Sequence, residues 1–463
     1  MFPESLKEWL ELLETRHPTE IELGLDRIGR VAKQLGLLPS ASANEDPDSP
    51  ISNDGKKTPY PIAKKIITVA GTNGKGSCVA AIDSILRSAN FQVGTYTSPH
   101  FTRYNERICI NGSNIDDESI CTAFERIEVA RGDISLSYFE FGTLAAFLVM
   151  AEHDLDVAIL EVGLGGRLDA VNILDTDIAV VTSIALDHED WLGSDLNVIA
   201  AEKAAIGRPE KPLIYGDVIP VSGLLEQAKL IGAELILNGH DFSLPDFYKE
   251  VKRHNEVKRY SEVKGSGEGS SIGYNLLPDN SVACAVEAVN LLVPSLPESV
   301  IEQGLNSVEL KGRYQQEDIE GVRVVLDVAH NPQAAELLAK RLSTSSSKTL
   351  VNPIRAVFGA MEDKDIDGIW EPLLPLVHTW YFCDIPEQSR AAKAKNLAAL
   401  MYNKPVPPSS RVVDHQIFTE NSPVAALEKA LADSGKGDTL IVFGSFFTVG
   451  PVLSWLEAMR TAN

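Results

Sequence analysis

Short apolar runs, many of them rich in β-branched residues, alternate along the chain with stretches that have a helical pattern of apolar and polar positions. This alternation is typical of a parallel sheet that is covered by helices on both faces. The runs that we assign to strands are 66–70, 157–160, 178–182, 322–326, 356–358 and 439–443. Ligands of such sheets bind beyond the carboxyl ends of the strands, so we expect catalytic and ligand-binding residues directly after each run.

The length of the chain, 463 residues, suggests two or three domains, each able to bury a core of its own. Residues 311–314 follow a helical pattern and precede a new strand, so we expect a domain boundary there. This predicts an N-terminal domain over 1–310 and a C-terminal domain over 314–463. Two polar stretches, 39–61 and 249–271, predict flexible surface insertions.

The charge and the cysteine content narrow the class of protein. The chain has 42 Lys and Arg against 65 Asp and Glu, a formal net charge of −23. This balance argues against nucleic acid or an anionic membrane as a partner, but not against a small anionic ligand. No apolar run is long enough to span a bilayer, and the first residues show no secretory signal. The five cysteines are scattered without a C-x-x-C pair, which is typical of reduced thiols. We therefore expect a cytoplasmic protein, and we expect a monomer because there are no coiled-coil heptads.

A glycine-rich loop, GTNGKGS at 71–77, follows the first predicted strand and precedes a helical stretch at 78–86. In this arrangement the backbone N–H groups and the positive end of the helix face phosphate oxygens, and the lysine adds a point charge. The loop departs from the usual phosphate-loop motif because Val69 replaces the first glycine and Gly76 follows the lysine. The alternative is an ordinary glycine-rich turn. We expect a nucleotide site that is formed by Thr72, Asn73, Gly74, Lys75, Gly76 and Ser77.

Two acids stand directly after apolar runs, where ligands of the sheet would bind. Glu161 follows 157–160, and a carboxylate beside bound phosphates is suited to Mg²⁺, which prefers oxygen ligands. The alternative for Glu161 is a solvated acid at the end of a strand. Asp327 follows 322–326 in the predicted second domain, at an equivalent ligand-facing position.

The loop resembles the phosphate loop of the Mur ligase superfamily, and the glycine after the lysine resembles its folylpolyglutamate synthase and dihydrofolate synthase branch. Other strings resemble the same branch, in family order. They are IELGLDRI at 21–28, TSPHFTRYNERI at 97–108, YFE at 138–140, EVGLGGRLDA at 161–170, LDH at 186–188, AEK at 201–203, GRY at 312–314, DVAHNP at 327–332 and GSFF at 444–447. This resemblance covers most of the chain. It implies a phosphate-loop ATPase domain with a parallel sheet, followed by a smaller Rossmann-like α/β domain.

The resemblance also implies cofactors for the N-terminal domain, namely ATP and two Mg²⁺ sites. It assigns Ser98, Glu161 and His188 as metal ligands, although imidazole suits softer metals and His188 could equally be a loop histidine. Lys203 matches a lysine that is carbamylated in the superfamily, with Ala205 where the family usually has glycine. A carbamate would turn this cation into an anion that supports the metal site.

The resemblance implies further ATP and glutamate contacts. Asn280, before the alanine-rich stretch 281–285, is the nearest match to the asparagine on the adenine side, although the His-Gln that usually precedes it is missing. In the C-terminal domain, Arg313 and Asp327 would contact ATP when the domains close. His330 and Ser445 would contact glutamate, and the alternative for His330 is a histidine that caps its own helix.

The reaction implied is ATP-dependent amide formation, with Lys75, Lys203, Asp327, His330 and Ser445 as catalytic residues. The γ-phosphoryl group passes to a carboxylate, and the amine of L-glutamate then displaces phosphate from the acyl phosphate. A folate or dihydropteroate would be the acceptor, and we expect one enzyme to use both. The residues implied to contact it are Gly24, Leu25, Tyr138, Phe139, Glu140, Leu168, Asp169 and Ala170. Tyr138 and Phe139 could stack on a flat ring, or they could belong to the core.

Two other functions are compatible with parts of this pattern. A peptidoglycan-type Mur ligase would share the loop, Glu161, Lys203 and 327–332, but it generally begins with a further domain, and here only about 65 residues precede the loop. A non-catalytic nucleotide-binding regulator would be expected to have lost Lys75, Glu161, Lys203 or His330, and all four are present.

Overall fold

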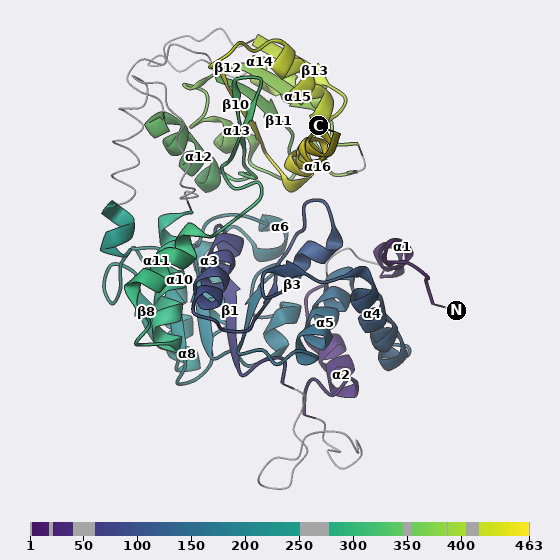
Figure 1. The fold of residues 1–463 in the computed structure, drawn as a ribbon, viewed down its shortest axis with the longest axis vertical. Helices are drawn as coiled ribbons and strands as arrows, with labels where there is room; N and C mark the ends of the chain where they lie inside the picture. The colour runs from purple at the N-terminus through teal and green to yellow at the C-terminus, as the bar shows by residue number, and fades with distance from the viewer. Residues whose placement is uncertain are drawn as a thin grey trace. The chain divides into compact units, whose positions relative to one another are not determined.

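The computed structural model describes residues 2–17, 22–39, 61–250, 277–345, 354–386, 388–403 and 416–462 (Figure 1). The insertions predicted at 39–61 and 249–271 lie outside the described residues, apart from their ends. The chain divides into two compact units. Unit 1 consists of Met1–His100, Tyr104–Pro245 and Leu277–Val308, and unit 2 consists of Phe101–Arg103, Asp246–Leu276 and Glu309–Asn463.

The described residues of unit 1 form an eight-stranded sheet in the order β4-β3-β2-β5-β1-β6-β7-β8. The strands are β1 (Lys65–Ala70), β2 (Val93–Tyr96), β3 (Ile108–Ile110), β4 (Ser113–Asn114), β5 (Val157–Glu161), β6 (Ile178–Val181), β7 (Pro212–Tyr215) and β8 (Glu234–Leu237). Strand β1 lies in the middle, and it pairs in parallel with β5 on one side and β6 on the other. Strands β3 and β4 are antiparallel, so the sequence prediction of a parallel sheet holds for the centre and not for this edge.

Helices cover both faces of the unit 1 sheet. They are α1 (Leu6–Arg16), α2 (Asp26–Gln34), α3 (Lys75–Ser88), α4 (Asp117–Arg131), α5 (Tyr138–Ala151), α6 (Glu189–Leu192), α7 (Leu196–Ala204), α8 (Ser222–Ile231), α10 (Asp279–Leu292) and α11 (Glu298–Asn306), with the 3₁₀ turns η1 (Tyr104–Arg107) and η2 (Ala170–Ile173). Helices α3, α10 and α11 pack together on one face (Figure 1). On the other face, α5 packs against Tyr96, Ala158 and Leu160, while α7 and α8 pack on β6 and β7.

Unit 2 has a sheet in the order β13-β12-β11-β14-β10-β9 within the described residues. Its strands are β9 (Gln315–Ile319), β10 (Val322–Leu326), β11 (Ile354–Phe358), β12 (Val377–Cys383), β13 (Gln416–Glu420) and β14 (Thr439–Phe443). Its helices are α12 (Pro332–Ser345), α13 (Ile366–Trp370), α14 (Ala394–Tyr402), α15 (Pro423–Ala432) and α16 (Phe446–Ala462). Strand β9 is antiparallel to β10, and the other pairs are parallel. One face of the sheet packs on α12, α13 and α14, and the other on α15 and α16.

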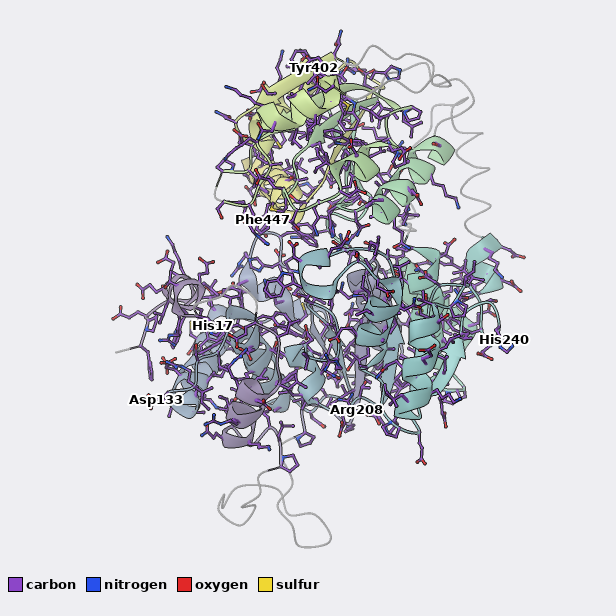
Figure 2. All side chains as sticks on the ribbon, turned by 180° about the vertical axis from the view of Figure 1, so that it is seen from behind. His17, Asp133, Arg208, His240, Tyr402 and Phe447 are labelled. Atoms are coloured by element: carbon purple, nitrogen blue, oxygen red, sulfur yellow. The ribbon has the colours of Figure 1, made fainter. Side chains whose placement is uncertain are left out.

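Side chains fill both cores and join neighbouring loops (Figure 2). Arg208, for example, donates hydrogen bonds to the carbonyl oxygens of Asn172 at 3.0 Å and Leu174 at 2.9 Å, which ties the end of α7 to the segment before β6. All five cysteines lie in the described part of the chain and are free thiols, three of them buried. Among the helices that the structure describes, none is both long and apolar enough to span a membrane.

Candidate active site

The glycine-rich loop connects β1 to α3 at the middle of the sheet, as the sequence predicts. Two of its glycines are required by the geometry. Gly74 has a φ of +83°, and a Cβ on it would lie 2.3 Å from the Ser281 hydroxyl oxygen. A Cβ on Gly71 would lie 2.0 Å from the Thr182 hydroxyl oxygen. The loop therefore packs directly against residues that follow β6 and begin α10.

The segment after β6 holds the loop by hydrogen bonds. The Thr72 N–H donates to the Ser183 carbonyl oxygen at 2.8 Å, and the Thr72 hydroxyl donates to the Ala185 carbonyl oxygen at 3.1 Å. The Thr182 hydroxyl donates to the Asn73 carbonyl oxygen at 2.7 Å, and the Asn73 N–H donates to the Ser183 hydroxyl at 3.0 Å. Thr182 and Ser183 were not predicted as site residues, although Thr182 ends a predicted strand and Ser183 directly follows it.

Gly76, the second departure from the usual motif, lies beside a buried carboxylate. A Cβ on Gly76 would lie 3.7 Å from a carboxylate oxygen of Glu161. Gly76 thus lies in contact distance of this carboxylate, which is only 4% exposed at the end of β5. Lys75 Nζ donates to the carbonyl oxygen of Gly71 at 3.0 Å, so the lysine folds over the loop.

The predicted metal ligands Ser98 and Glu161 are neighbours, because Glu161 ends β5 and Ser98 follows the adjacent parallel strand β2. The Ser98 N–H donates to Glu161 Oε2 at 3.2 Å. His188 is exposed just before α6, and it lines a pocket together with Lys75, Asp187 and Lys203. Glu161 and the Ser98 hydroxyl are oxygen donors of the kind that Mg²⁺ prefers. Among the described residues, no three His, Cys, Asp or Glu side chains gather in a group that could hold a metal ion.

Lys203 is a buried amine beside the phosphate loop. It lies in α7, is 5% exposed, and donates from Nζ to the Gly71 carbonyl oxygen at 3.3 Å. Burial, and then the nearby charge of Lys75, lower the pKa of Lys203 to about 7. Ala205 has a φ of −68°, so the glycine that usually stands there is not required in this chain.

Asn280 lies at the start of α10, next to the loop that follows β6. Its side-chain amide donates to the Thr182 carbonyl oxygen at 2.9 Å and lies 3.5 Å from Asp217 Oδ1. Asp217 also accepts from the Ile184 N–H at 2.9 Å and from the Tyr215 hydroxyl at 3.2 Å. Asp217 therefore positions Asn280 relative to the loop. The sequence analysis missed it, although it stands two residues beyond β7.

The residues implied to contact the acceptor come together from three parts of unit 1. The Gly24 N–H donates to the Leu168 carbonyl oxygen at 3.2 Å, which joins the entrance of α2 to the segment before η2. Leu25 directly precedes α2, and Ala170 begins η2. Phe139 at the start of α5 packs its ring on the backbone of Gly163.

Asp169, between Leu168 and Ala170, is a buried carboxylate that organises this region. It accepts hydrogen bonds from the N–H groups of Leu164 and Val171, each at 2.9 Å. Burial raises its pKa to about 6, although these N–H groups favour the ionised form. Its oxygens thus fix the turn between β5 and η2.

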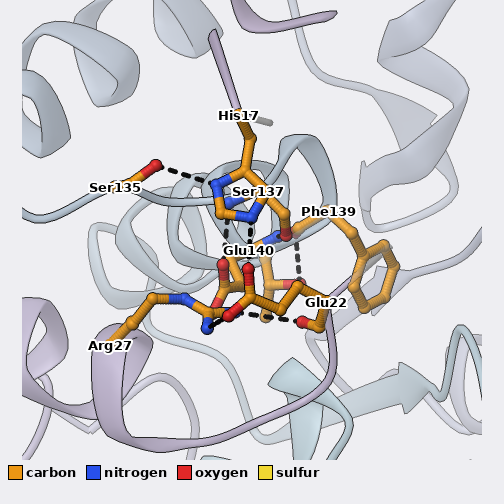
Figure 3. A network of polar contacts seen from close by, with 8 residues as sticks. His17, Glu22, Arg27, Ser135, Ser137, Phe139 and Glu140 are labelled. Carbon is orange, nitrogen blue, oxygen red and sulfur yellow. Dashed lines mark hydrogen bonds and ion pairs between the residues drawn. The ribbon is translucent and has the colours of Figure 1, made fainter. Parts of the chain in front are cut away.

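Glu140 is part of a polar network that ties the N-terminal segment to α5 (Figure 3). Its Oε2 accepts from the Ser137 N–H at 2.7 Å, while the Ser137 hydroxyl accepts from the Glu140 N–H, a reciprocal capping box. Its Oε1 accepts from Arg27 Nη2 at 3.2 Å, and Arg27 also pairs with Glu22. Glu22 in turn accepts from His17 Nε2 at 2.8 Å. Both oxygens of Glu140 are therefore engaged within the protein.

The predicted residues of unit 2 lie at the carboxyl ends of β10 and β14. Asp327 accepts from the N–H groups of Tyr314 at 2.9 Å and Ala329 at 2.8 Å, and burial raises its pKa. Arg313 lies over the ring of Phe446, 4.9 Å from its centroid.

His330 and Ser445 occupy the turns that begin helices of unit 2. His330 Nδ1 lies 2.8 Å from the Val328 carbonyl oxygen, and Asn331, not His330, accepts the N–H of Ala334 and caps α12. Ser445 accepts from the Thr448 N–H at 3.0 Å and so caps α16.

Comparison with known proteins agrees with this arrangement. The Mur ligase middle domain matches residues 69–215, and the Mur ligase glutamate ligase domain matches residues 312–446. The chain is 39% identical to dihydrofolate synthase/folylpolyglutamate synthase of Escherichia coli (strain K12), over 99% of this chain and 97% of that protein. The chain belongs to the dihydrofolate synthase/folylpolyglutamate synthase family. The family member of Haemophilus influenzae is 34% identical over 98% of each chain.

Solved structures of this family have the same fold. Escherichia coli FolC, in complex with DHPP and ADP, has a TM-score of 0.81 at 37% identity and 99% coverage of both chains. The bifunctional folylpolyglutamate synthase/dihydrofolate synthase of Yersinia pestis, complexed with AMPPNP and Mn ion, has a TM-score of 0.79 at 36% identity, covering 99% of this chain and 100% of that one. The family and the two-part α/β fold that the motifs predicted are thus confirmed.

Proposed function

We propose that this protein is an ATP-dependent ligase that joins L-glutamate to the carboxylate of a folate or dihydropteroate, with release of ADP and phosphate. The observation that carries the proposal is the full-length match to dihydrofolate synthase/folylpolyglutamate synthase relatives. Support comes from the convergence of a phosphate loop, the Ser98–Glu161 pair and the buried Lys203 at one end of the unit 1 sheet.

A free carboxylate is a poor acceptor because its charge repels the amine and its oxygen is a poor leaving group. Phosphorylation by ATP removes both obstacles, and the amine of glutamate then displaces phosphate. In this proposal the backbone N–H groups of 71–76 and Lys75 bind the phosphates and offset the charge that develops on them. Asn280, held by Asp217, would contact the adenine side.

In this proposal Ser98 and Glu161 would hold one divalent cation, and His188 would serve a second. Such a cation supplies charge neutralisation at the transferring phosphoryl group when it is bound. The residues of this chain position it, since the Ser98 backbone and the Glu161 carboxylate are already joined by a hydrogen bond.

Carbamylation of Lys203 is part of the proposal. Carbon dioxide reacts with a neutral amine and not with an ammonium ion, and the pKa of about 7 leaves a large neutral fraction at neutral pH. The carbamate would place a negative charge beside Lys75, whose positive charge acts on Lys203.

For unit 2, we propose that Arg313 and Asp327 contact ATP and that His330 and Ser445 contact glutamate. A cytoplasmic location, a monomeric state, and the domain limits 1–310 and 314–463 also remain predictions of the sequence. Use of both dihydropteroate and tetrahydrofolate as acceptors is the remaining part of the proposal.

The test is ADP release that depends on both glutamate and the acceptor, with dihydropteroate and tetrahydrofolate offered separately. We expect turnover with at least one acceptor, and transfer of ¹⁸O from the acceptor carboxylate into inorganic phosphate. Turnover only with a uridine-linked muramyl acceptor would instead identify a peptidoglycan-type ligase. Nucleotide binding without turnover on any of these acceptors would favour a regulator.

A further inference from the structure

Arg107 is a buried cation at the carboxyl-end edge of the unit 1 sheet. It ends η1 and directly precedes β3, and its side chain and backbone together are only 8% exposed. The Arg107 carbonyl oxygen accepts a hydrogen bond from the N–H of Thr97 at 2.9 Å. Arg107 therefore lies opposite Thr97, the residue that directly precedes Ser98. Nothing in the reaction proposed above uses it.

The Arg107 guanidinium contacts uncharged side chains. Arg107 Nε donates to His100 Nδ1 at 2.9 Å, which requires an unprotonated nitrogen at that position. The guanidinium lies over the ring of Tyr104, 5.2 Å from its centroid, and 5.6 Å from the centroid of Tyr138. Burial raises the pKa of Tyr138 to about 12 and also raises that of Tyr104, so these phenols carry no charge near neutral pH.

Other shielded arginines of the chain are paired differently. Arg27, Arg131 and Arg355 each form an ion pair with an Asp or Glu. Within the described part of the chain, Arg107 has no carboxylate within ion-pair distance. A buried charge without a countercharge is costly, and contact with tyrosine rings offsets only part of this cost.

An anionic ligand would supply the missing charge. The planar fork of a guanidinium matches a carboxylate, which it can bind through two parallel N–H···O hydrogen bonds. Tyr138 provides an aromatic wall beside it, and Phe139 follows on α5 next to Tyr96, with ring centroids 6.0 Å apart. The phosphates of a nucleotide already have a predicted binding site in the loop at 71–76, and aromatic rings beside a guanidinium suit a carboxylate that is carried on a flat ring.

We infer that Arg107 binds the carboxylate of the acceptor substrate and orients it toward the phosphoryl donor. This inference rests on the proposed function, since it takes the acceptor to be a pteroate or folate. Arg107 is then a specificity-determining residue, because it selects an acid over a neutral analogue of the same ring system. His100 and Tyr104 are positioning residues that hold the guanidinium.

The test compares two ligands and two proteins. Binding of dihydropteroate and of its carboxamide, which lacks the negative charge, is measured by calorimetry for the wild type and for Arg107→Gln. Loss of a charge-assisted pair should weaken dihydropteroate binding by about 10- to 100-fold. Binding of the carboxamide should change less than about threefold. The matched control is Arg126→Gln, an exposed arginine paired with Glu152, which should change neither affinity.

Nucleotide affinity is measured on the same variants as a test of folding. Equal weakening of both ligands, or weakened nucleotide binding, would show that Arg107 only supports the fold, and the inference would be wrong. Unchanged dihydropteroate binding would also overturn it. If Arg107→Gln does not fold, Arg107→Lys takes its place, with a loss of several-fold expected for the acid alone. A wild type that binds neither ligand contradicts the proposed function itself.

Discussion

Lys203 and Lys75 share one acceptor, the carbonyl oxygen of Gly71, at distances of 3.3 and 3.0 Å. Two amines that converge on one oxygen repel each other when both are protonated, and the buried one is the easier to neutralise. The charge around the phosphate loop therefore depends on whether Lys203 is protonated, neutral or carbamylated. Three consequences of this dependence can be measured.

Lys203→Met should reduce turnover by at least about 100-fold and leave the thermal unfolding temperature unchanged or higher. Methionine keeps the apolar stem but cannot carry a carbamate or a charge. ADP release and a thermal melt measure the two effects. Lys211→Met, at a half-buried lysine that pairs with Asp177, is the matched control and should retain activity. Full activity of Lys203→Met would exclude a role for this amine.

Activity should also depend on carbon dioxide and pH. Removal of CO₂ from the buffer should lower turnover, and added bicarbonate should restore it. Since the pKa of Lys203 is about 7, activity should fall as the pH decreases below 7, because the protonated amine cannot form a carbamate. The pH profile of the wild type with and without bicarbonate measures this. A profile that is insensitive to bicarbonate would contradict carbamylation.

The lowered pKa of Lys203 also predicts that the free energy of unfolding changes with pH. Its pKa is lower in the folded protein, about 7, than its ordinary value of 10.5, so the unfolded chain binds more protons between these values. In the absence of CO₂ the free energy of unfolding should therefore rise from about pH 7 to pH 10, relative to Lys203→Met. Urea unfolding of both proteins at several pH values measures the difference, which should be constant if Lys203 does not titrate.

Lys75→Ala and Glu161→Gln should both abolish turnover without unfolding the chain. Lys75→Ala removes a cation from the phosphate loop, so nucleotide affinity should fall by about 10-fold or more. Glu161→Gln removes the carboxylate beside Gly76, so the affinity for Mg-ATP should fall while that for metal-free ATP does not. Titration of nucleotide with and without Mg²⁺ separates the two effects. Identical behaviour of both variants would argue against Glu161 as a metal ligand.

Asp217→Ala should raise the KM for ATP several-fold and leave the KM for the acceptor unchanged. The carboxylate holds the Ile184 N–H and the Asn280 amide, so its loss frees the amide to rotate away from the loop. Steady-state kinetics with each substrate varied separately measures this. Asp241→Ala, at an exposed acid of the same unit, is a suitable control. An unchanged KM for ATP would mean that Asn280 does not need this support.

Glu140→Ala should destabilise unit 1 by about 3 kcal/mol, since it removes a capping box and leaves Arg27 with one carboxylate fewer. Glu140→Gln can still accept the Ser137 N–H and should cost less. Urea unfolding of both variants measures the difference. Equal stability of wild type and Glu140→Ala, with weakened acceptor binding, would instead favour direct contact with the substrate.

The sequence predicted the central strands well and the sheet edges poorly. Strands β10 and β14 coincide with their predicted runs, because each is mostly apolar and buried at four of its five positions. Strand β9 reads QQEDI and β4 reads SN, so neither has an apolar run to detect. Their pairing depends on the neighbouring strand, which local pattern cannot show.

The residues of the candidate site could be predicted where a functional side chain directly follows or ends a predicted strand. The phosphate loop and Glu161 satisfy that rule, and the structure brings Ser98 to Glu161 as adjacent parallel strands require. Arg107 was not assigned a role, because its surroundings come from α5 and from the segment that contains His100. Such a cluster of uncharged neighbours around a cation exists only in three dimensions.

The hydrogen bonds that join Thr72 and Asn73 to Ser183 and Ala185 have a further consequence. They fix the conformation of the loop without a bound ligand. The conformational entropy of its backbone is therefore lost when the chain folds, and not when a nucleotide binds. A nucleotide would then bind to a loop whose backbone N–H groups are already in position for its phosphates. A change at Ser183, which touches no predicted substrate, would accordingly loosen the loop and slow every step that depends on it.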